Sequence, residues 1–173
     1  MSYASQRGVG LIEVLVALVI LAIGILGFAA LQLKALDAAQ QATEQNIAMN
    51  TARDLAERMR INRTALSDYK TAINKKTTTD TCHGVTDITT PKSLAIPKCN
   101  TAIFALQDVG EVLTKASENG QTIVVDKCVK SQLDCIYVAW GKTEITANDL
   151  SACIDPKTGT YVVDSKCLVL EAF

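Results

Sequence analysis

The sequence predicts an α+β fold: a long N-terminal helix, apolar in its first half, packed on a small antiparallel sheet that disulfide bonds staple. Three observations predict this class. Residues 9–33 form an apolar run with a single charge, Glu13. The chain then continues to residue 62 without a proline or a glycine. All six cysteines of the 173-residue chain follow residue 81, among segments rich in β-branched side chains.

The first segment, residues 9–33, is predicted to cross a membrane as one helix. As an α-helix it would be about 37 Å long, whereas the hydrocarbon core of a bilayer is about 30 Å thick. A buried core helix is a weaker reading because a small domain cannot cover so long an apolar helix on every side. A cleaved secretory signal could end at "GFAA" (27–30), but its apolar region would be only about 7–15 residues long.

The next segment, residues 34–62, is predicted to continue the same helix. It is rich in Ala, Gln, Glu, Leu and Arg, which are strong helix formers. Apolar residues recur at spacings of three and four, which indicates a one-sided amphipathic helix. They are Leu33, Leu36, Ile47, Ala48, Ala52, Leu55, Ala56 and Met59. Asp54 and Arg58 form an acid–base pair four residues apart on the helix surface. We therefore expect one helix from Val9 to Asn62.

The remainder, residues 63–173, is predicted to form the sheet and its cover. Residues 64–100 are polar, contain two prolines and read as a loop. Residues 101–120 have apolar residues at helical spacing, and Gly120 is a plausible end of that helix. Strands are expected at four β-rich segments, with the turn sequence "DPKTG" (155–159) before the third. The four segments are residues 121–126, 134–140, 160–163 and 167–173.

The cysteines indicate an oxidising compartment, because their number is even and all of them follow the apolar segment. They are Cys82, Cys99, Cys128, Cys135, Cys153 and Cys167. Six cysteines allow 15 pairings, and the sequence does not choose among them. Proximity along the chain favours Cys82 with Cys99, Cys128 with Cys135, and Cys153 with Cys167. A metal site is not expected, because the spacings supply no pair two to four residues apart.

Composition and motifs argue against an enzyme. The net charge is −1 and aromatic residues make up 5% of the chain, which disfavours a nucleic-acid surface. His83 is the only histidine, and a disulfide-bonded Cys82 beside it could not act as a nucleophile. "GKT" (141–143) lacks the preceding glycine of a phosphate loop. Arg58, Arg60 and Arg63 read as a solvated face, with a DNA site kept as the alternative. We expect no catalytic residues, no cofactor and no small-molecule substrate.

The segment "RGVGLIEVLVAL" (7–18) is similar to the processing signal of the type IV pilin family. In that family a short leader ends in glycine, and glutamate occupies the fifth position after the cut. The resemblance implies that a prepilin peptidase removes residues 1–8, cutting between Gly8 and Val9, and methylates the new amino group of Val9. It also implies the pilin fold, with residues 9–33 as the transmembrane half of the long helix, 34–62 as its amphipathic half, and 63–173 as an exported domain of αβ-loop and antiparallel sheet.

Three further segments resemble the PilV group of minor pilins, the type IV pilus modification proteins. They are "ARDLAERMRINR" (52–63), "CIYVAWGKTE" (135–144) and "CLVLEAF" (167–173). The resemblance implies a structural subunit that helps to prime or cap pilus assembly. The expected partners are the prepilin peptidase, the major pilin and other minor pilins, with a tip adhesin as a further candidate. The expected location is the bacterial inner membrane, with the C-terminal domain in the periplasm, and then the pilus at the cell surface.

Glu13 has two readings. A carboxylate near the bilayer centre costs roughly 2.5–3.5 kcal/mol, so the family solution is to pair it with the Val9 ammonium of a neighbouring subunit as an assembly register. Alternatively, Glu13 lies at the level of the lipid headgroups with no partner. Two other functions remain open: a minor pseudopilin of a type II secretion system, and an exported binding domain on an ordinary signal-anchor. Removal of residues 1–8 is expected for a minor pilin and for a minor pseudopilin, but not for an exported domain on a signal-anchor.

Overall fold

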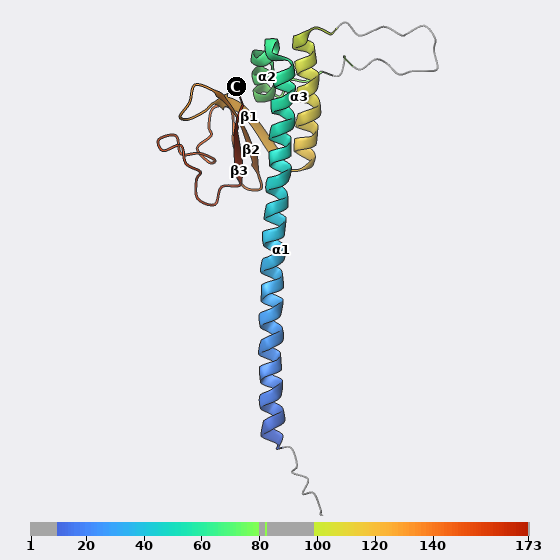
Figure 1. Cartoon of the computed structure of the whole chain (residues 1–173), viewed down its shortest axis with the longest axis vertical. Coiled ribbons are helices and arrows are strands. Elements are labelled where there is room, and N and C mark those ends of the chain that lie inside the picture. The colour runs from blue at the N-terminus through green and yellow to red at the C-terminus, as the bar shows by residue number, and fades with distance from the viewer. Residues whose placement is uncertain (1–9, 80–81, 83–98, 173) are drawn as a thin grey trace, which may run out of the picture. The chain divides into compact units, whose positions relative to one another are not determined.

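A computed structural model of the chain describes residues 10–79, 82 and 99–172. Figure 1 shows a long helix followed by two shorter helices and a small sheet. The elements are α1 (Leu11–Ile61), the 3₁₀-helix η1 (Arg63–Ala65), α2 (Leu66–Lys75), α3 (Thr101–Glu118), β1 (Gln121–Lys127), β2 (Asp134–Trp140) and β3 (Cys167–Glu171). The predicted α+β class, with its long N-terminal helix and small antiparallel sheet, is confirmed.

Helix α1 is continuous over the predicted range, from Leu11 to Ile61, and belongs to two compact units. The first unit ends at Thr43 and the second spans Glu44–Phe173. In the second unit, α1 buries one stripe of side chains at the spacing that the sequence predicts: Ala48, Ala52, Leu55 and Met59. Leu33 and Leu36 were expected in the same stripe, but they lie in the first unit and are exposed.

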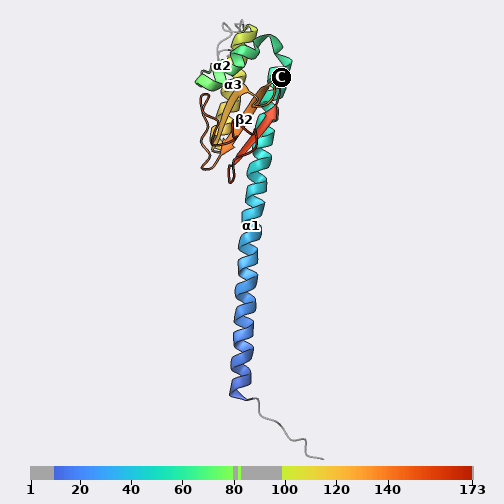
Figure 2. The same ribbon diagram turned by 90° about the vertical axis from the view of Figure 1, so that its left-hand side faces the viewer.

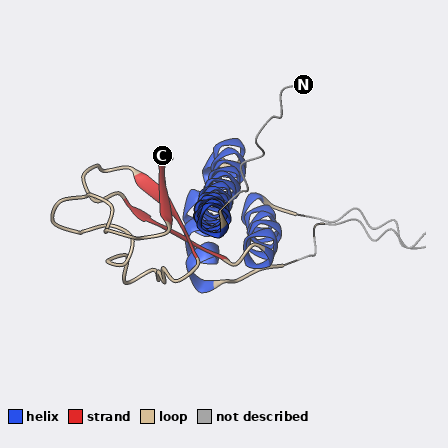
Figure 3. Ribbon diagram, turned by 90° about the horizontal axis from the view of Figure 1, so that it is seen from below, coloured by secondary structure: helices blue, strands red, loops and turns tan. Residues whose placement is uncertain are grey.

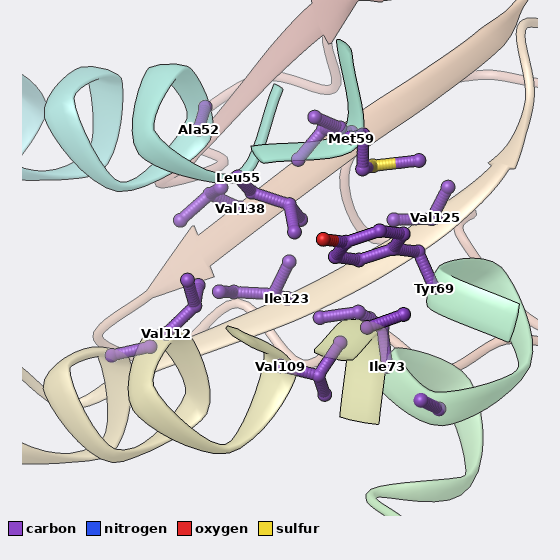
Figure 4. Close-up of a cluster of buried hydrophobic side chains, with 14 of the residues drawn as sticks. Ala52, Leu55, Met59, Tyr69, Ile73, Val109, Val112, Ile123, Val125 and Val138 are labelled. Carbon is purple, nitrogen blue, oxygen red and sulfur yellow. The ribbon is translucent and has the colours of Figure 1, made fainter. Parts of the chain in front are cut away.

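The sheet is antiparallel with strand order β1-β2-β3 (Figure 2). Because side chains alternate along a strand, each strand contributes to two apolar clusters on opposite faces. Seen from below, the helices lie on one side of the sheet and the long loops on the other (Figure 3). The helix side holds the larger cluster, drawn in Figure 4, and the loop side holds a smaller cluster around Tyr137 and Cys153.

The larger cluster joins all three helices to the sheet (Figure 4). The cluster contains Leu55 and Met59 of α1, Tyr69 of α2, Val109 of α3 and Val138 of the middle strand, and all five are buried. Burial of this kind supplies most of the stability of a helix in a protein. The end of α1 is therefore part of the core of the second unit.

The loop predicted for residues 64–100 is wrong at its beginning, where η1 and α2 form. Residues 66–75 carry a clear apolar face, on which Tyr69, Ala72 and Ile73 are buried, and this pattern is masked by the polar residues between them. Helix α2 ends at Lys75, and the cap residue Lys76 has a left-handed backbone (φ 53°) and donates from its N–H to the Ile73 carbonyl. Residues 83–98, most of the rest of the predicted loop, lie outside the described residues.

The strand predicted for residues 160–163 is also wrong. Tyr161 makes only an isolated bridge with Ile154. The chain then turns, with the Ser165 N–H donating to the Val162 carbonyl, and Val163 points into solvent with 87% of its surface exposed. β-propensity alone does not make a strand, and the backbone of residues 160–163 forms no continuous ladder with a neighbouring strand.

Helix α3 begins and ends as its sequence predicts. The Asn100 side chain accepts a hydrogen bond from the Ile103 N–H at 2.9 Å, as an N-cap residue does. After the helix, Gly120 adopts φ +63°, a backbone conformation that glycine reaches without the penalty a Cβ imposes. The buried face consists of Ala105, Val109, Val112 and Ala116, together with Gln107, whereas Phe104 is half-exposed.

Three disulfide bonds join neighbouring cysteines in the sequence: Cys82–Cys99, Cys128–Cys135 and Cys153–Cys167. These are the pairs that proximity along the chain favours. The second bond closes the β1–β2 hairpin, and the third ties the loop before β3 to the first residue of that strand. In the chain-entropy picture, a closed loop of about 15 residues contributes about 3 kcal/mol.

Candidate functional site

Glu13 lies in the first turn of α1, on a surface that is otherwise apolar. Its N–H donates to the Gly10 carbonyl at 2.9 Å, and its position near the helix N-terminus suits a negative charge. Together with Val14, Ala17, Leu18 and Leu21 it lines a shallow depression along the helix. The apolar side chains around it are exposed, so this surface is free to contact lipid or other helices.

Among the described residues, α1 is the one helix long and apolar enough to cross a membrane. Glu13 is the only charged side chain in its first 23 residues, Leu11–Leu33. The predicted processing site, Gly8 and Val9, lies outside the described residues. The structure thus describes the helix that begins just after the predicted cut and the carboxylate in its first turn.

Arg58 is the centre of an ion-pair network between α1 and α3. Its guanidinium contacts Asp54 at 2.9 Å, Asp108 at 2.6 Å and Glu111 at 2.9 Å. The Tyr69 hydroxyl of α2 donates to the same Asp108. The Asp54 contact confirms the predicted pair within α1, but no periodicity predicts the partners from α3, which come from residues at least 50 positions away.

The electrostatics of this network follow from its composition. Burial disfavours the charge of Arg58, but hydrogen bonds and charge attraction from its three carboxylate partners outweigh that effect and raise its pKa above the ordinary value. Burial and the neighbouring Asp108 raise the pKa of the Tyr69 hydroxyl as well. At every physiological pH the arginine is charged and the tyrosine is a neutral donor. The predicted solvated face is therefore wrong for Arg58, whose guanidinium is engaged between α1 and α3 by these carboxylates.

A second ion pair links α2 to the sheet. Lys70 contacts Asp126 of β1 at 2.9 Å and Asp134 of β2 at 3.4 Å. Burial opposes the charge of Asp126, but hydrogen bonds from the Lys70 side chain and the Lys127 backbone, together with attraction to both lysines, outweigh burial and lower the pKa of Asp126 below its ordinary value of 3.8. Hydrogen bonding to Asp126 raises the pKa of Lys70.

These shifts predict how stability depends on pH. A carboxyl group whose pKa is lowered by folding stabilises the fold fully above its ordinary pKa of 3.8 and loses that contribution as the pH falls through the lowered value. We expect Asp126→Asn to make the free energy of unfolding less dependent on pH below about 4. Urea unfolding of the detergent-solubilised chain at several acidic pH values measures this. Glu118→Gln at the end of α3 is the control, and an equal flattening by both variants would contradict the assignment.

Glu44, the first residue of the second unit, binds the sheet through two groups. Its Oε2 accepts from the Trp140 indole Nε1 at 3.1 Å and from Lys166 Nζ at 2.9 Å. Trp140 ends β2 and Lys166 precedes β3. The contact fixes α1 against one end of the sheet. The sequence offers no signal for it, because 96 residues separate Glu44 from Trp140.

The other residues that the sequence analysis considered as functional candidates do not form a common site among the described residues. The "GKT" segment is a turn after β2: Gly141 has φ +66°, and the Thr143 N–H donates to the Trp140 carbonyl. Tyr137 is buried in the smaller cluster, as strand aromatics commonly are. Arg60 and Arg63 are exposed. His83 lies outside the described residues.

Comparison with family models covers most of the first two thirds of the chain. Residues 3–29 match the model of the prokaryotic N-terminal methylation motif. Residues 30–110 match the type IV pilin Tt1218 model, so that the two matches adjoin and together contain the whole of α1. The chain belongs to the type IV pilin family. No curated protein and no solved structure matches it.

Membership of the type IV pilin family accounts for the methylation motif and the long apolar helix of this pilin. The methylation motif implies processing by a prepilin peptidase and assembly with other pilins. The apolar first part of α1 is consistent with anchoring in a membrane and packing in a pilus. Type IV pilins are structural proteins.

Proposed function

We propose that this pilin is a minor pilin, a structural subunit that helps to prime or cap the assembly of a type IV pilus. The observation that carries the proposal is Glu13, the lone carboxylate of an apolar helix, five positions after the predicted cut and inside the methylation motif. The resemblance of residues 52–63, 135–144 and 167–173 to PilV minor pilins supports the minor role over that of the main shaft subunit.

The proposal divides the chain by function. Residues 1–8 are a leader, removed on the cytoplasmic face by the prepilin peptidase, and Val9 becomes the methylated N-terminus. Residues 9–33 hold the protein in the inner membrane, and residues 34–62 are the amphipathic half of the helix. Residues 63–173 form the periplasmic domain, which reaches the cell surface when the subunit enters the pilus. Its core includes the last part of α1, so it is exported together with that helix.

Glu13 acts as the register of assembly. Its carboxylate pairs with the Val9 ammonium of a neighbouring subunit, because each charge alone in the membrane would be costly. Breaking a buried ion pair by removal of one partner costs about 3–5 kcal/mol. A subunit in the wrong axial position leaves both charges unpaired, so the pair selects the position in which the helices join. Other pilins, including the major pilin, supply these neighbours, and a tip adhesin is a further partner.

Processing tests the proposal directly. We expect the mature protein from host membranes to begin at Val9 with one added methyl group, and Gly8→Val to abolish the cut, because the family peptidase requires glycine before it. Intact-mass measurement distinguishes the products, since the uncut chain is heavier by eight residues and lacks the methyl group. Gly10→Ala, two residues beyond the cut, is the control and should be processed normally.

Two outcomes would redirect the assignment. A wild-type chain that keeps residues 1–8 would make it an exported domain on an ordinary signal-anchor. A processed chain that is missing from sheared pili, but that is required for type II secretion, would make it a minor pseudopilin. Quantifying the protein in sheared pili by mass spectrometry therefore follows the mass measurement.

A further inference from the structure

The two edges of the sheet differ in how their backbone groups are covered. At the β1 edge, the Asn74 side chain of α2 replaces a neighbouring strand: its Nδ2 donates to the Val125 carbonyl at 2.8 Å, and its Oδ1 accepts from the Val125 N–H at 3.1 Å. Lys70 and Asp126 add an ion pair beside it. Helix α2 thus covers this edge at Val125 and Asp126.

The β3 edge is open. The hydrogen bonds from the Trp140 N–H to the Lys166 carbonyl and from the Ala172 N–H to the Asp134 carbonyl set the ladder between β2 and β3. In that ladder the odd-numbered residues of β3 direct their N–H and C=O groups away from the sheet. They are Cys167, Val169 and Glu171. Within the described residues, only the N–H of Val169 has a partner there, the Tyr161 hydroxyl at 3.1 Å.

This edge has few of the features that usually prevent strand addition. Proteins protect an edge strand with lysine or another charge, proline, a bulge, short length or a covering segment. β3 has five residues and ends in Glu171, but it contains no lysine or proline, its ladder to β2 is regular, and in the described part of the chain the contact on its outward N–H groups is the single Tyr161 hydroxyl at Val169. Beside it, Val169 and Tyr161 line a groove of about 310 Å³ together with Val129, which is exposed at 39%. An open backbone edge beside an apolar groove is the combination that binds extended peptides.

We propose that the open edge of β3 binds an extended segment of a different pilus-assembly subunit, which adds a fourth strand to the sheet. The segment exchanges main-chain hydrogen bonds with Cys167, Val169 and Glu171, and displaces the Tyr161 hydroxyl from Val169. One apolar side chain of the segment fills the groove. The inference rests on the proposed function, since assembly is what brings such a subunit to this edge.

The charged side chains beside the groove indicate which side chains the bound segment should carry. Glu171 is engaged by the Ser131 hydroxyl at 2.5 Å. Lys130 lies along the rim against Gly159, and no ion pair of its ammonium is found among the described residues. An acidic side chain of the segment complements this lysine. The bound strand therefore carries an apolar residue and a carboxylate on the face that meets the groove.

A proline at Val169 tests the inference, because it removes the outward N–H and leaves the β2–β3 ladder intact. In the full-length protein expressed in its host, we expect Val169→Pro to reduce the amount in sheared pili at least about tenfold. Val169→Ala, which shortens the same side chain but keeps the amide, should stay within about twofold of wild type. Three intact disulfides and normal removal of residues 1–8 show that a variant has folded and matured. Equal incorporation of a folded Val169→Pro would overturn the inference.

If Val169→Pro does not fold, hydrogen exchange of the wild-type protein tests whether a strand adds to β3. The amides of Cys167, Val169 and Glu171 should exchange at least about tenfold more slowly in assembled pili than in the detergent-solubilised monomer, while Leu168 and Leu170 change little. If the protein enters pili but these amides stay unprotected, the inference about β3 is wrong and the proposed pilin function is unaffected. If the protein never enters pili, the proposed function itself is contradicted. Protection that develops with concentration in the purified chain alone would make the occupant a second copy and overturn the assignment to a different subunit.

Discussion

Glu13→Ala is expected to be inserted and cleaved normally, yet to be nearly absent from pili. The substitution makes the apolar helix more apolar, so membrane insertion is not weakened, and Gly8 and Val9 are unchanged. What is lost is the partner of a neighbour's Val9 ammonium. Leaving that charge unpaired costs about 3–5 kcal/mol, which corresponds to a factor of at least about 100 in the occupancy of the correct position. The readout is the ratio of protein in sheared pili to protein in the membrane.

The control for this prediction is Asp37→Ala. Asp37 is an exposed acid of the same helix, beyond the apolar run, and accepts a hydrogen bond from Gln41 at 3.3 Å. Its loss should leave incorporation unchanged, because a hydrated carboxylate is worth little. If Glu13→Ala enters pili as wild type does, Glu13 merely lies at the headgroup level and the register argument is wrong.

Arg58→Ala is expected to destabilise the second unit by about 3 kcal/mol. The arginine is mostly buried, with 22% of its side chain exposed, and it balances Asp54, Asp108 and Glu111. Without it, Asp108 and Glu111 lose their arginine partner, although Lys115 of α3 still contacts Asp54 at 3.5 Å and Asp108 still holds the Tyr69 hydroxyl. Loss of Arg58 thus removes most of the attraction between the two helices in this network. Urea unfolding of the detergent-solubilised full-length chain measures the change.

The matched control is Arg60→Ala, on an exposed position of the same helix. Its effect should remain within about 0.5 kcal/mol. A second test comes from the double variant Arg58→Ala with Asp108→Asn. Relieving one of the stranded carboxylates should recover part of the lost stability, because residues within one ion-pair network do not contribute additively. Equal destabilisation by Arg58→Ala and Arg60→Ala would show that the Arg58 network contributes no more to the free energy of unfolding than an exposed surface charge does.

Local patterns predicted the elements whose signals lie within a few residues. The apolar run of residues 9–33 and the uninterrupted helix formers after it yielded α1 nearly to the residue. Apolar residues at helical spacing and Gly120 predicted α3, and β-rich segments predicted β1, β2 and β3. Two local predictions were wrong for opposite reasons. The apolar residues of helix α2 are interrupted by polar ones, so its buried face is not evident from the sequence, whereas residues 160–163 have β-propensity but form only an isolated bridge.

The sequence by itself determined that this chain is a type IV pilin: the lone Glu13, the glycine before the predicted cut and the length of the apolar helix are all local features of one segment. Only the tertiary structure decided what surrounds Arg58 and Glu44, and which edge of the sheet stays open. Asp108 meets Arg58 across 50 residues, and Asn74 closes the β1 edge across 51. Such contacts depend on how helices pack over a sheet, and packing is set by the summed fit of many side chains rather than by any short pattern.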